Sequence, residues 1–442
     1  MPKMTYIIQL RPYLANTSWI LASRVATLTS AFFVTAMTAR HLGPAEFGIL
    51  SYAISLTGLF AITIHLGLSG LTVREMVRHP TEIHYVMGTV LAMKFSAALL
   101  AFSSLTVVTI LTESTNTIVP FVILLVGIRL FLNPLQTFHQ WFEARVEARY
   151  IAFAQSISAV VCILLTLILV YLNADIIFFA INALFHFTFT EVLVLAFFLT
   201  RSSVAISTFS ASLARAKTLF KQGWPIFIGS VFAVIYLKAD QVMLRWLVGD
   251  HEVGQYAVAA ALSEAWYIVP VALVTSFFPK LIGQAQENSG MYRRNLQHIL
   301  DALLLIAVFV AVLVTVFAQT IVAVLFGDAY LRSADILTIH VWGAIFIFLR
   351  AAFSKWILIE EQYMLSLITQ GSGAVINIAL NLILIPYHGG LGAAYATVIA
   401  YAFASYVSLF FFPQSRGFAF LMTRTFFLPP RLAHFLWQRA AR

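Results

Sequence analysis

The chain has 442 residues, of which 61% are hydrophobic and 10% are charged. Soluble globular domains contain about 25% charged residues, so this composition excludes an ordinary soluble protein. The formal net charge is +9. Most bases lie between apolar runs, which is typical of cytoplasmic loops and argues against a nucleic-acid partner. The only cysteine, Cys162, excludes an intramolecular disulfide.

Apolar runs along the chain predict an all-α polytopic membrane protein. A helix of about 20 apolar residues crosses the roughly 30 Å of hydrocarbon in a bilayer. We predict twelve such spans, at residues 14–39, 46–67, 83–111, 117–138, 150–172, 175–200, 223–248, 253–279, 295–318, 334–358, 363–385 and 391–412.

The basic residues predict the orientation of these spans. With the N-terminus inside, 18 Lys and Arg residues outside the spans fall on the inner side, and only Arg40 and Arg332 fall on the outer side. Cytoplasmic loops are enriched in such residues, so both termini are predicted to be cytoplasmic. The outer connections are short, and none of them can form a domain.

The longest polar connection, residues 201–222, lies midway along the chain and is basic. It predicts an N-terminal lobe at 1–200, a cytoplasmic linker at 201–222, a C-terminal lobe at 223–413 and a basic tail at 414–442. The end of the tail, RLAHFLWQRAAR at 431–442, predicts an interfacial helix, with a disordered basic tail as the alternative.

Two similar outer turns indicate that the lobes are repeats. HLGPAEFG at 41–48 resembles LVGDHEVG at 247–254. The matched positions, 206 residues apart, are Gly43, Glu46 and Gly48 with Gly249, Glu252 and Gly254. Six spans separate the turns, so equivalent helices run in the same direction and predict a pseudo-two-fold axis along the membrane normal. The glycines allow positive φ, and each Glu lies near a helix start, where the helix dipole favours an anion.

Several charges lie deep inside the predicted spans, where each costs about 2.5–3.5 kcal/mol. The bases are Arg24, Lys94, Arg129, Lys238 and Arg350, and the acids are Glu191, Asp240 and Glu264. The excess of bases favours a cavity for anions, and guanidinium groups match phosphate oxygens, so a diphosphate head group is a suitable ligand. Structural ion pairing or snorkelling to an interface is the alternative for each charge.

No metal-ligand spacing and no nucleophile–base pair stands out in the sequence, so we expect a transporter without a metal or cofactor rather than an enzyme. His139 stands alone in the connection between spans four and five.

Three stretches resemble Wzx-type lipid-linked oligosaccharide flippases, the polysaccharide-transporter branch of the multidrug/oligosaccharidyl-lipid/polysaccharide superfamily. They are RHLGPAEFGILSYAISLTGLFAITIHLGLSGLTVRE, KADQVMLRWLVGDHEVGQYAVAAALSEAWYIVPVALVTSFFPKL at 238–281 and NLILIPYHGGLGAAYATVIAYAFAS at 381–405. The resemblance extends over nearly the whole chain.

The resemblance implies two six-helix lobes around a central cavity. It also implies that the protein moves undecaprenyl-diphosphate-linked oligosaccharide across the bacterial inner membrane by alternating access, for O-antigen or other surface polysaccharide. Asp240 matches the acid of the family's seventh helix, and Arg74 in LTVRE matches the base after its second helix. The deep bases would contact the diphosphate, although charges in spans three, four and ten vary in such proteins.

The resemblance further implies coupling to H⁺ or Na⁺, with Asp240, Glu264 and Glu191 as candidates for ion coupling or internal pairing. The expected partners are the lipid-linked glycan, membrane lipids, and a polysaccharide polymerase with its chain-length machinery. Three alternatives stay open: a drug or ion antiporter of the superfamily, which would have an acidic cavity; a lipid II flippase, which usually has two further helices; and a membrane glycan polymerase or ligase, which usually has a large outer loop.

Overall fold

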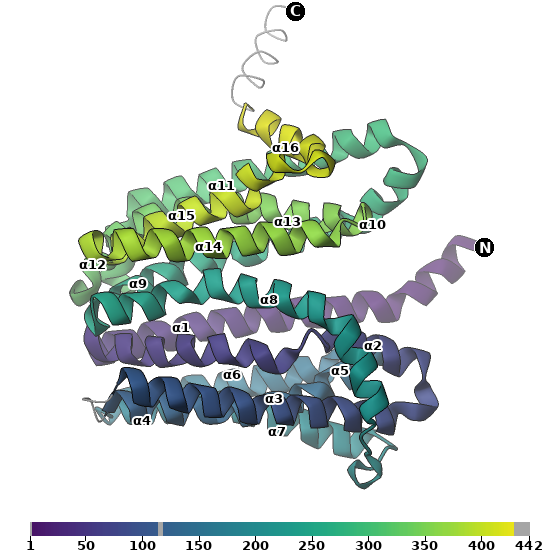
Figure 1. Cartoon of the computed structure of the whole chain (residues 1–442), viewed down its shortest axis with the longest axis horizontal. Coiled ribbons are helices and arrows are strands. Elements are labelled where there is room, and N and C mark those ends of the chain that lie inside the picture. The colour runs from purple at the N-terminus through teal and green to yellow at the C-terminus, as the bar shows by residue number, and fades with distance from the viewer. Residues whose placement is uncertain (1, 114–117, 428–442) are drawn as a thin grey trace, which may run out of the picture. The chain divides into compact units, whose positions relative to one another are not determined.

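A computed structural model describes residues 2–113 and 118–427 of the chain. Every regular element in these residues is a helix, which confirms the predicted all-α polytopic class. The helices form two compact units, Met1–Val234 and Ile235–Arg442 (Figure 1). The helix predicted at 431–442 lies outside the described residues.

The first unit packs its helices around α1. A hydrophobic cluster lies where α5 meets α7, with Phe138, Trp141 and Phe198 fully buried. The elements of this unit are α1 (Pro2–His65), α2 (Ser69–Arg78), η1 (Pro80–Glu82), α3 (Ile83–Thr112), α4 (Ile118–Gly127), η2 (Ile128–Phe131), η3 (Asn133–Gln136), α5 (Thr137–Ala144), α6 (Ala148–Tyr171), α7 (Ile176–Arg201), η4 (Ile206–Thr208) and the start of α8 (Leu213–Leu247).

The second unit contains the rest of α8 and the C-terminal helices. Its core joins α10, α11, α13 and α16, with Leu300, Phe348 and Phe418 at its centre. The elements are α9 (Asp250–Glu264), η5 (Ala265–Tyr267), α10 (Ile268–Glu287), α11 (Ser289–Phe326), η6 (Asp328–Tyr330), α12 (Leu331–His340), η7 (Val341–Gly343), α13 (Ala344–Ile359), α14 (Tyr363–His388), α15 (Gly390–Ser405), η8 (Val407–Phe411) and α16 (Pro413–Phe426).

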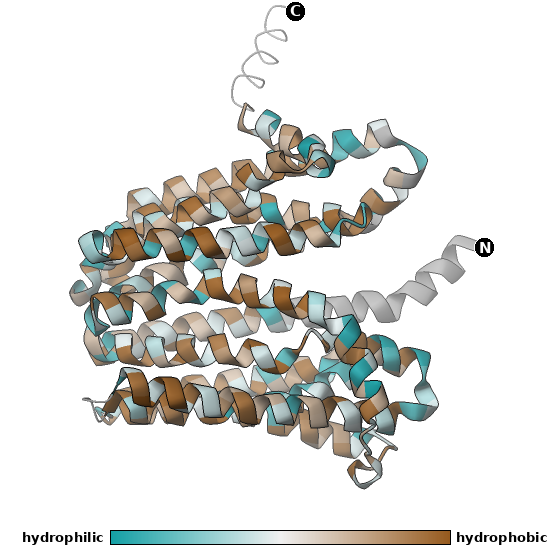
Figure 2. Ribbon diagram, in the orientation of Figure 1, coloured by the Kyte–Doolittle hydropathy of each residue, from teal (hydrophilic) through white to brown (hydrophobic). Residues whose placement is uncertain are grey.

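Each of the twelve predicted spans has a helical counterpart. Among the described residues, 11 helical stretches are long and apolar enough to cross a membrane, and the first of them, Ser23–Arg78, contains most of the first predicted span and all of the second. A helix pairs its backbone N–H and C=O groups internally. This is necessary in a membrane, because hydrocarbon offers these groups no hydrogen-bond partner. Hydrophobic residues run along the helices in Figure 2, whereas hydrophilic ones gather towards many of their ends.

The turn predicted near residues 41–48 is confirmed, although it is shorter than the predicted connection at residues 40–45. Within α1, two helices meet at a kink in this stretch, where Gly43 has φ 73° and ψ 172°. Gly249, at the matching position of the repeat, has φ 117° and separates α8 from α9. Only glycine adopts such angles without strain, so one residue is enough to end one helix and begin the next.

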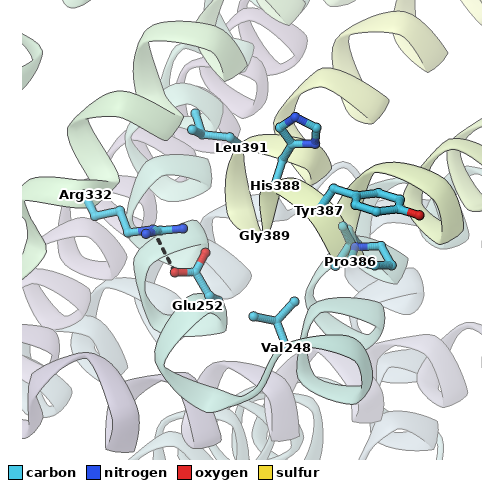
Figure 3. A pocket seen from close by; sticks show the side chains of 9 residues that line it. Val248, Glu252, Arg332, Pro386, Tyr387, His388, Gly389 and Leu391 are labelled. Carbon is cyan, nitrogen blue, oxygen red and sulfur yellow. Dashed lines mark ion pairs between the residues drawn. The ribbon is translucent and has the colours of Figure 1, made fainter.

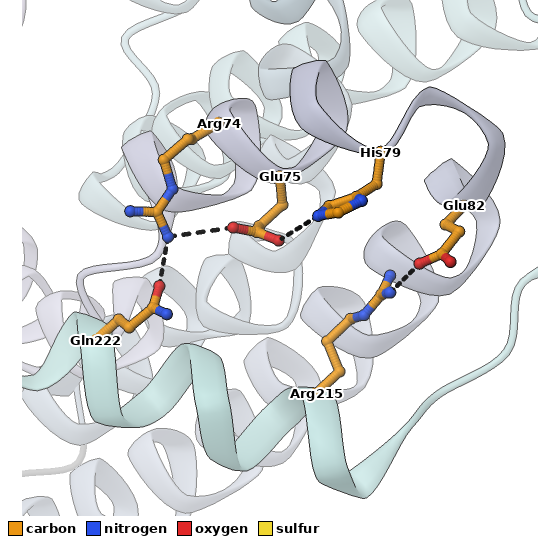
Figure 4. A network of polar contacts seen from close by, with 6 residues as sticks. All are labelled: Arg74, Glu75, His79, Glu82, Arg215 and Gln222. Carbon is orange, nitrogen blue, oxygen red and sulfur yellow. Dashed lines mark hydrogen bonds and ion pairs between the residues drawn. The ribbon is translucent and has the colours of Figure 1, made fainter.

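Helix α8 begins inside the segment predicted as a linker, and its start is fixed to the first unit. The backbone N–H of Ser212 donates to Thr89 Oγ1 at 3.0 Å. Two further contacts appear in Figure 4: Arg215 pairs with Glu82, and Arg74 bridges Glu75 and Gln222. The linker is therefore a docked part of the first unit.

Gly88 on α3 allows the backbone of the linker to approach this helix closely. A Cβ at Gly88 would lie 2.5 Å from the carbonyl oxygen of Ser210 and 2.6 Å from its nitrogen. Gly88→Ala should therefore displace the linker and lower the free energy of unfolding by about 1–3 kcal/mol.

Thermal unfolding of the purified protein in detergent measures this effect. Gly58→Ala is the matched control, because a Cβ on that helical glycine meets no heavy atom within 4 Å. Equal melting temperatures for the two variants would contradict close packing at Ser210.

Candidate functional site

Asp240 is the centre of a buried polar cluster in the second unit. The side chain is 2% exposed. Its Oδ2 accepts hydrogen bonds from the Tyr256 hydroxyl at 2.6 Å and from Thr397 Oγ1 at 2.5 Å, and its Oδ1 accepts from Asn381 Nδ2 at 2.6 Å. These donors come from α9, α15 and α14, so the carboxylate joins four helices. Among the described contacts, neutral groups alone donate to this carboxylate.

Two amides one helical turn apart complete the cluster. Asn381 Nδ2 also donates to Asn377 Oδ1 at 3.2 Å. Asn381 Oδ1 and Asn377 Nδ2 are buried without a hydrogen-bond partner in the described residues. An amide can exchange its oxygen and nitrogen by a half rotation, so Asn381 can turn an oxygen towards a cation bound beside Asp240. A carboxylate, two hydroxyls and amide oxygens form a donor set that suits a hard cation.

Lys94 is at the centre of a second buried cluster, in the first unit. The residue is 1% exposed on α3, and its Nζ lies 3.5 Å from Gln140 Oε1 on α5. Glu191 on α7 is 3% exposed and lies 3.0 Å from His139 Nε2. The charges of Glu191 and Glu143 both act on Lys94. The cluster therefore contains its own counter-charges.

Three deep guanidinium groups differ from Lys94 in this respect. Arg350 is buried and donates to the Ala404 carbonyl at 3.1 Å and to Thr369 Oγ1 at 3.4 Å. Arg129 lies over the Phe187 ring at 5.7 Å, and its Nε is buried without a partner. Arg24 is exposed on α1. Among the side chains that the structure describes, no carboxylate pairs with any of the three.

The remaining predicted residues have separate surroundings. Lys238 is half-buried, and its charge acts on Glu264. Arg74 contacts Glu75 and Gln222 at the dock of α8. The structure thus places Arg24, Lys94 and Arg129 in the first unit and Lys238 and Arg350 in the second.

The repeated Gly-x-x-Glu turn has unequal roles in the two units. Glu46 is exposed, whereas Glu252 is buried. Glu252 Oε1 lies 2.7 Å from Arg332 Nε, and its Oε2 accepts from the backbone N–H of Gly390 at 2.8 Å. The pair lines a cavity of about 420 Å³ together with Tyr387 and His388 (Figure 3). The two oxygens of Glu252 thus connect α9 to α12 and to the start of α15, so its role here is structural.

The sequence analysis missed four members of the Asp240 cluster: Tyr256, Asn377, Asn381 and Thr397. The signal for two of them was present, because Asn377 and Asn381 lie four residues apart in an apolar span and so share one face of a helix. His139 also has a partner, Glu191, on a helix that is distant in sequence.

The charges of the Lys94 cluster should depend on each other for folding. Lys94→Met leaves His139 as the remaining described partner of Glu191, and an uncompensated buried charge costs up to about 3–5 kcal/mol. The yield of folded protein should fall, and adding Glu191→Gln should restore part of it. Size-exclusion chromatography of a fluorescent fusion measures this yield.

Lys217→Met is the control, because this lysine is exposed near the start of α8. A double variant with a lower yield than Lys94→Met would show that the two charges act independently.

Comparisons with known proteins agree with this architecture. The sequence profile of the family described as polysaccharide biosynthesis protein matches residues 13–283, and that of MatE matches residues 225–383. An uncharacterized membrane protein of Methanocaldococcus jannaschii is 25% identical over 203 residues, which span 44% of this chain and 38% of that relative.

Solved structures share the fold at low sequence identity. An inward-facing multidrug resistance MATE family transporter of the MOP superfamily is 14% identical, with a TM-score of 0.68 over 90% of this chain and 96% of its own. The lipid II flippase MurJ, in an inward closed conformation, is 14% identical, with a TM-score of 0.69 over 94% and 91%. The MATE multidrug transporter DinF-BH is 18% identical, with a TM-score of 0.58 over 91% and 96%.

The expectation of a multi-pass transporter rather than an enzyme agrees with these relatives. The family profile covers more than half of the chain, and the fold extends over both units. The chain belongs to the polysaccharide biosynthesis protein family and has the fold of the MOP-superfamily transporters.

Proposed function

We propose that this transporter moves undecaprenyl-diphosphate-linked oligosaccharide across the bacterial inner membrane by alternating access, with both of its termini in the cytoplasm. The substrate would supply a growing surface polysaccharide such as O-antigen. A polymerase and its chain-length machinery would then act on the product at the outer face. The polysaccharide biosynthesis profile over residues 13–283 supports this substrate class.

The observation that favours an anionic lipid is the set of deep guanidinium groups without carboxylate partners. Arg24, Arg129 and Arg350 have this property among the described side chains. A charge is rarely retained at such depth unless it meets a ligand or water. Guanidinium groups bind phosphate oxygens through two parallel hydrogen bonds, which fits the diphosphate. Lys94 and Lys238 are also predicted for this role, but Glu191 and Glu143 act on Lys94 and the charge of Lys238 acts on Glu264.

The acids inside the other predicted spans argue against a cationic drug as the substrate. Glu191 lies beside His139, the oxygens of Asp240 accept hydrogen bonds from three residues, and the charge of Lys238 acts on Glu264. A cationic substrate would compete with these contacts, whereas an anion meets uncompensated positive charge. The MatE profile over residues 225–383 keeps a drug antiporter as the second candidate.

Transport would be driven by a cation at Asp240. The cluster offers carboxylate, hydroxyl and amide oxygens on four helices, so a bound Na⁺ would hold α8, α9, α14 and α15 together. Departure of the ion would leave the carboxylate with its neutral donors and loosen this junction. A proton is the alternative coupling ion, because a protonated carboxyl group needs fewer donors.

Arg24 tests the substrate assignment. Arg24→Ala should abolish surface-glycan export while the protein inserts at normal abundance, since no described acid is left without its partner. Arg24→Lys should restore only part of the export, because lysine keeps the charge but loses the paired hydrogen bonds.

Surface glycan and protein abundance are measured together in cells lacking the native gene. Normal export by Arg24→Ala would remove Arg24 from the site. A large loss of abundance would instead identify a structural role.

Asp240 tests the coupling ion without any transport assay. A ligand present at 100 times its dissociation constant stabilises a protein by about 2.7 kcal/mol. The melting temperature of the purified protein should therefore rise with NaCl relative to choline chloride, and Asp240→Asn should remove the rise. Asp335→Asn is the matched control, because Asp335 is exposed in the same unit. A sodium response that survives in Asp240→Asn would place the ion elsewhere.

A further inference from the structure

A second cavity, of about 340 Å³, lies between α10 and α11 in the second unit. This volume is at the lower end of the range for ligand pockets, which is about 300–1,000 Å³. Both walls belong to one unit, and none of the residues in the two buried polar clusters lines the cavity. It therefore needs a separate explanation.

The walls change from apolar to polar along both helices. On α10, Leu273 and Phe277 are followed by Lys280 and Gln284. On the antiparallel α11, Asn295 and His298 lie at the polar end. Asn295 Nδ2 donates to Gln284 Oε1 at 2.8 Å, which links the helices there. A ligand that fills this cavity must be polar at one end and apolar at the other.

The polar end is basic. Lys280 and His298 are exposed, and no carboxylate lines the cavity among the side chains that the structure describes. Arg294, also exposed, lies four residues before His298 on α11 and so on the same side of this helix. Figure 2 shows hydrophilic residues where α10 leads into α11. The charge complements an anionic head group.

We propose that this cavity binds an anionic phospholipid of the cytoplasmic leaflet. The phosphate would lie between Lys280 and His298, and one acyl chain would follow Phe277, whose side chain is 46% exposed, towards Leu273. Basic pockets between spans on the cytoplasmic side bind anionic head groups, and the predicted orientation places 280–294 on that side. The site ties α10 to α11 near their turn and does not depend on which substrate is transported.

Native mass spectrometry of the full chain in detergent tests the proposal, with phosphatidylglycerol and phosphatidylcholine as probes. Phosphatidylglycerol should bind the wild type more tightly than phosphatidylcholine. The double variant Lys280→Gln/His298→Gln should lower the affinity for phosphatidylglycerol about tenfold, which corresponds to about 1.4 kcal/mol of binding free energy. Phosphatidylcholine binding should not change. Lys217→Gln is the matched control for non-specific attraction of the anionic lipid to surface bases. This lysine is exposed but distant from the cavity in sequence, and it lies in the first unit.

A variant without any charge change tests the apolar end. Ala302→Trp should fill the cavity and displace phosphatidylglycerol from a protein that still elutes as folded. Unchanged phosphatidylglycerol binding in both cavity variants would overturn the site, and so would an equal loss in Lys217→Gln.

Two competitors test the identity of the occupant. Inorganic phosphate at equal concentration should not displace the lipid, and displacement would reduce the site to a phosphate site. Undecaprenyl phosphate should bind no more tightly than phosphatidylglycerol, and tighter binding would make the cavity a substrate entrance instead.

Discussion

The cost of a charge in hydrocarbon is the constraint on which the site depends. The buried ionic groups in the spans differ in their partners among the described side chains. Lys94 and Glu191 belong to a cluster with charges of both signs, and Asp240 accepts three hydrogen bonds, whereas Arg129 and Arg350 meet no carboxylate. The first group fixes helices to each other, and we propose that the second meets the substrate. This difference separates the residues that build the transporter from those that we propose to meet its cargo.

The two units use different buried polar groups to hold their helices together. In the first, a buried ammonium and carboxylates join α3, α5 and α7. In the second, a single carboxylate draws neutral donors from three neighbouring helices. Such a carboxylate can release its neutral donors and bind a cation instead. No other charge then loses its partner. The two units thus share the turn at Gly43 and Gly249 but differ in their polar interiors.

The sequence predicted the helices well because hydropathy determines them almost alone. All twelve spans are helical, since apolar length and backbone hydrogen bonding depend on local residues. The side-chain partners were less predictable. Glu191 lies 52 residues after His139, and Thr397 lies 157 residues after Asp240. Such pairs depend on which helix faces meet, and one sequence does not contain this information. The connection at 40–45 is shorter than predicted, because a single glycine there is enough to separate two helices.

Helix α8 belongs to both units, since the boundary between them falls after Val234. A chain divided in the polar segment before Leu213 would leave residues 213–234 on the second fragment, although the partners of Arg215 and Gln222 lie on the first. The two halves of the chain are therefore not independent modules. Fragments expressed separately would have to recognise each other through the first turns of α8.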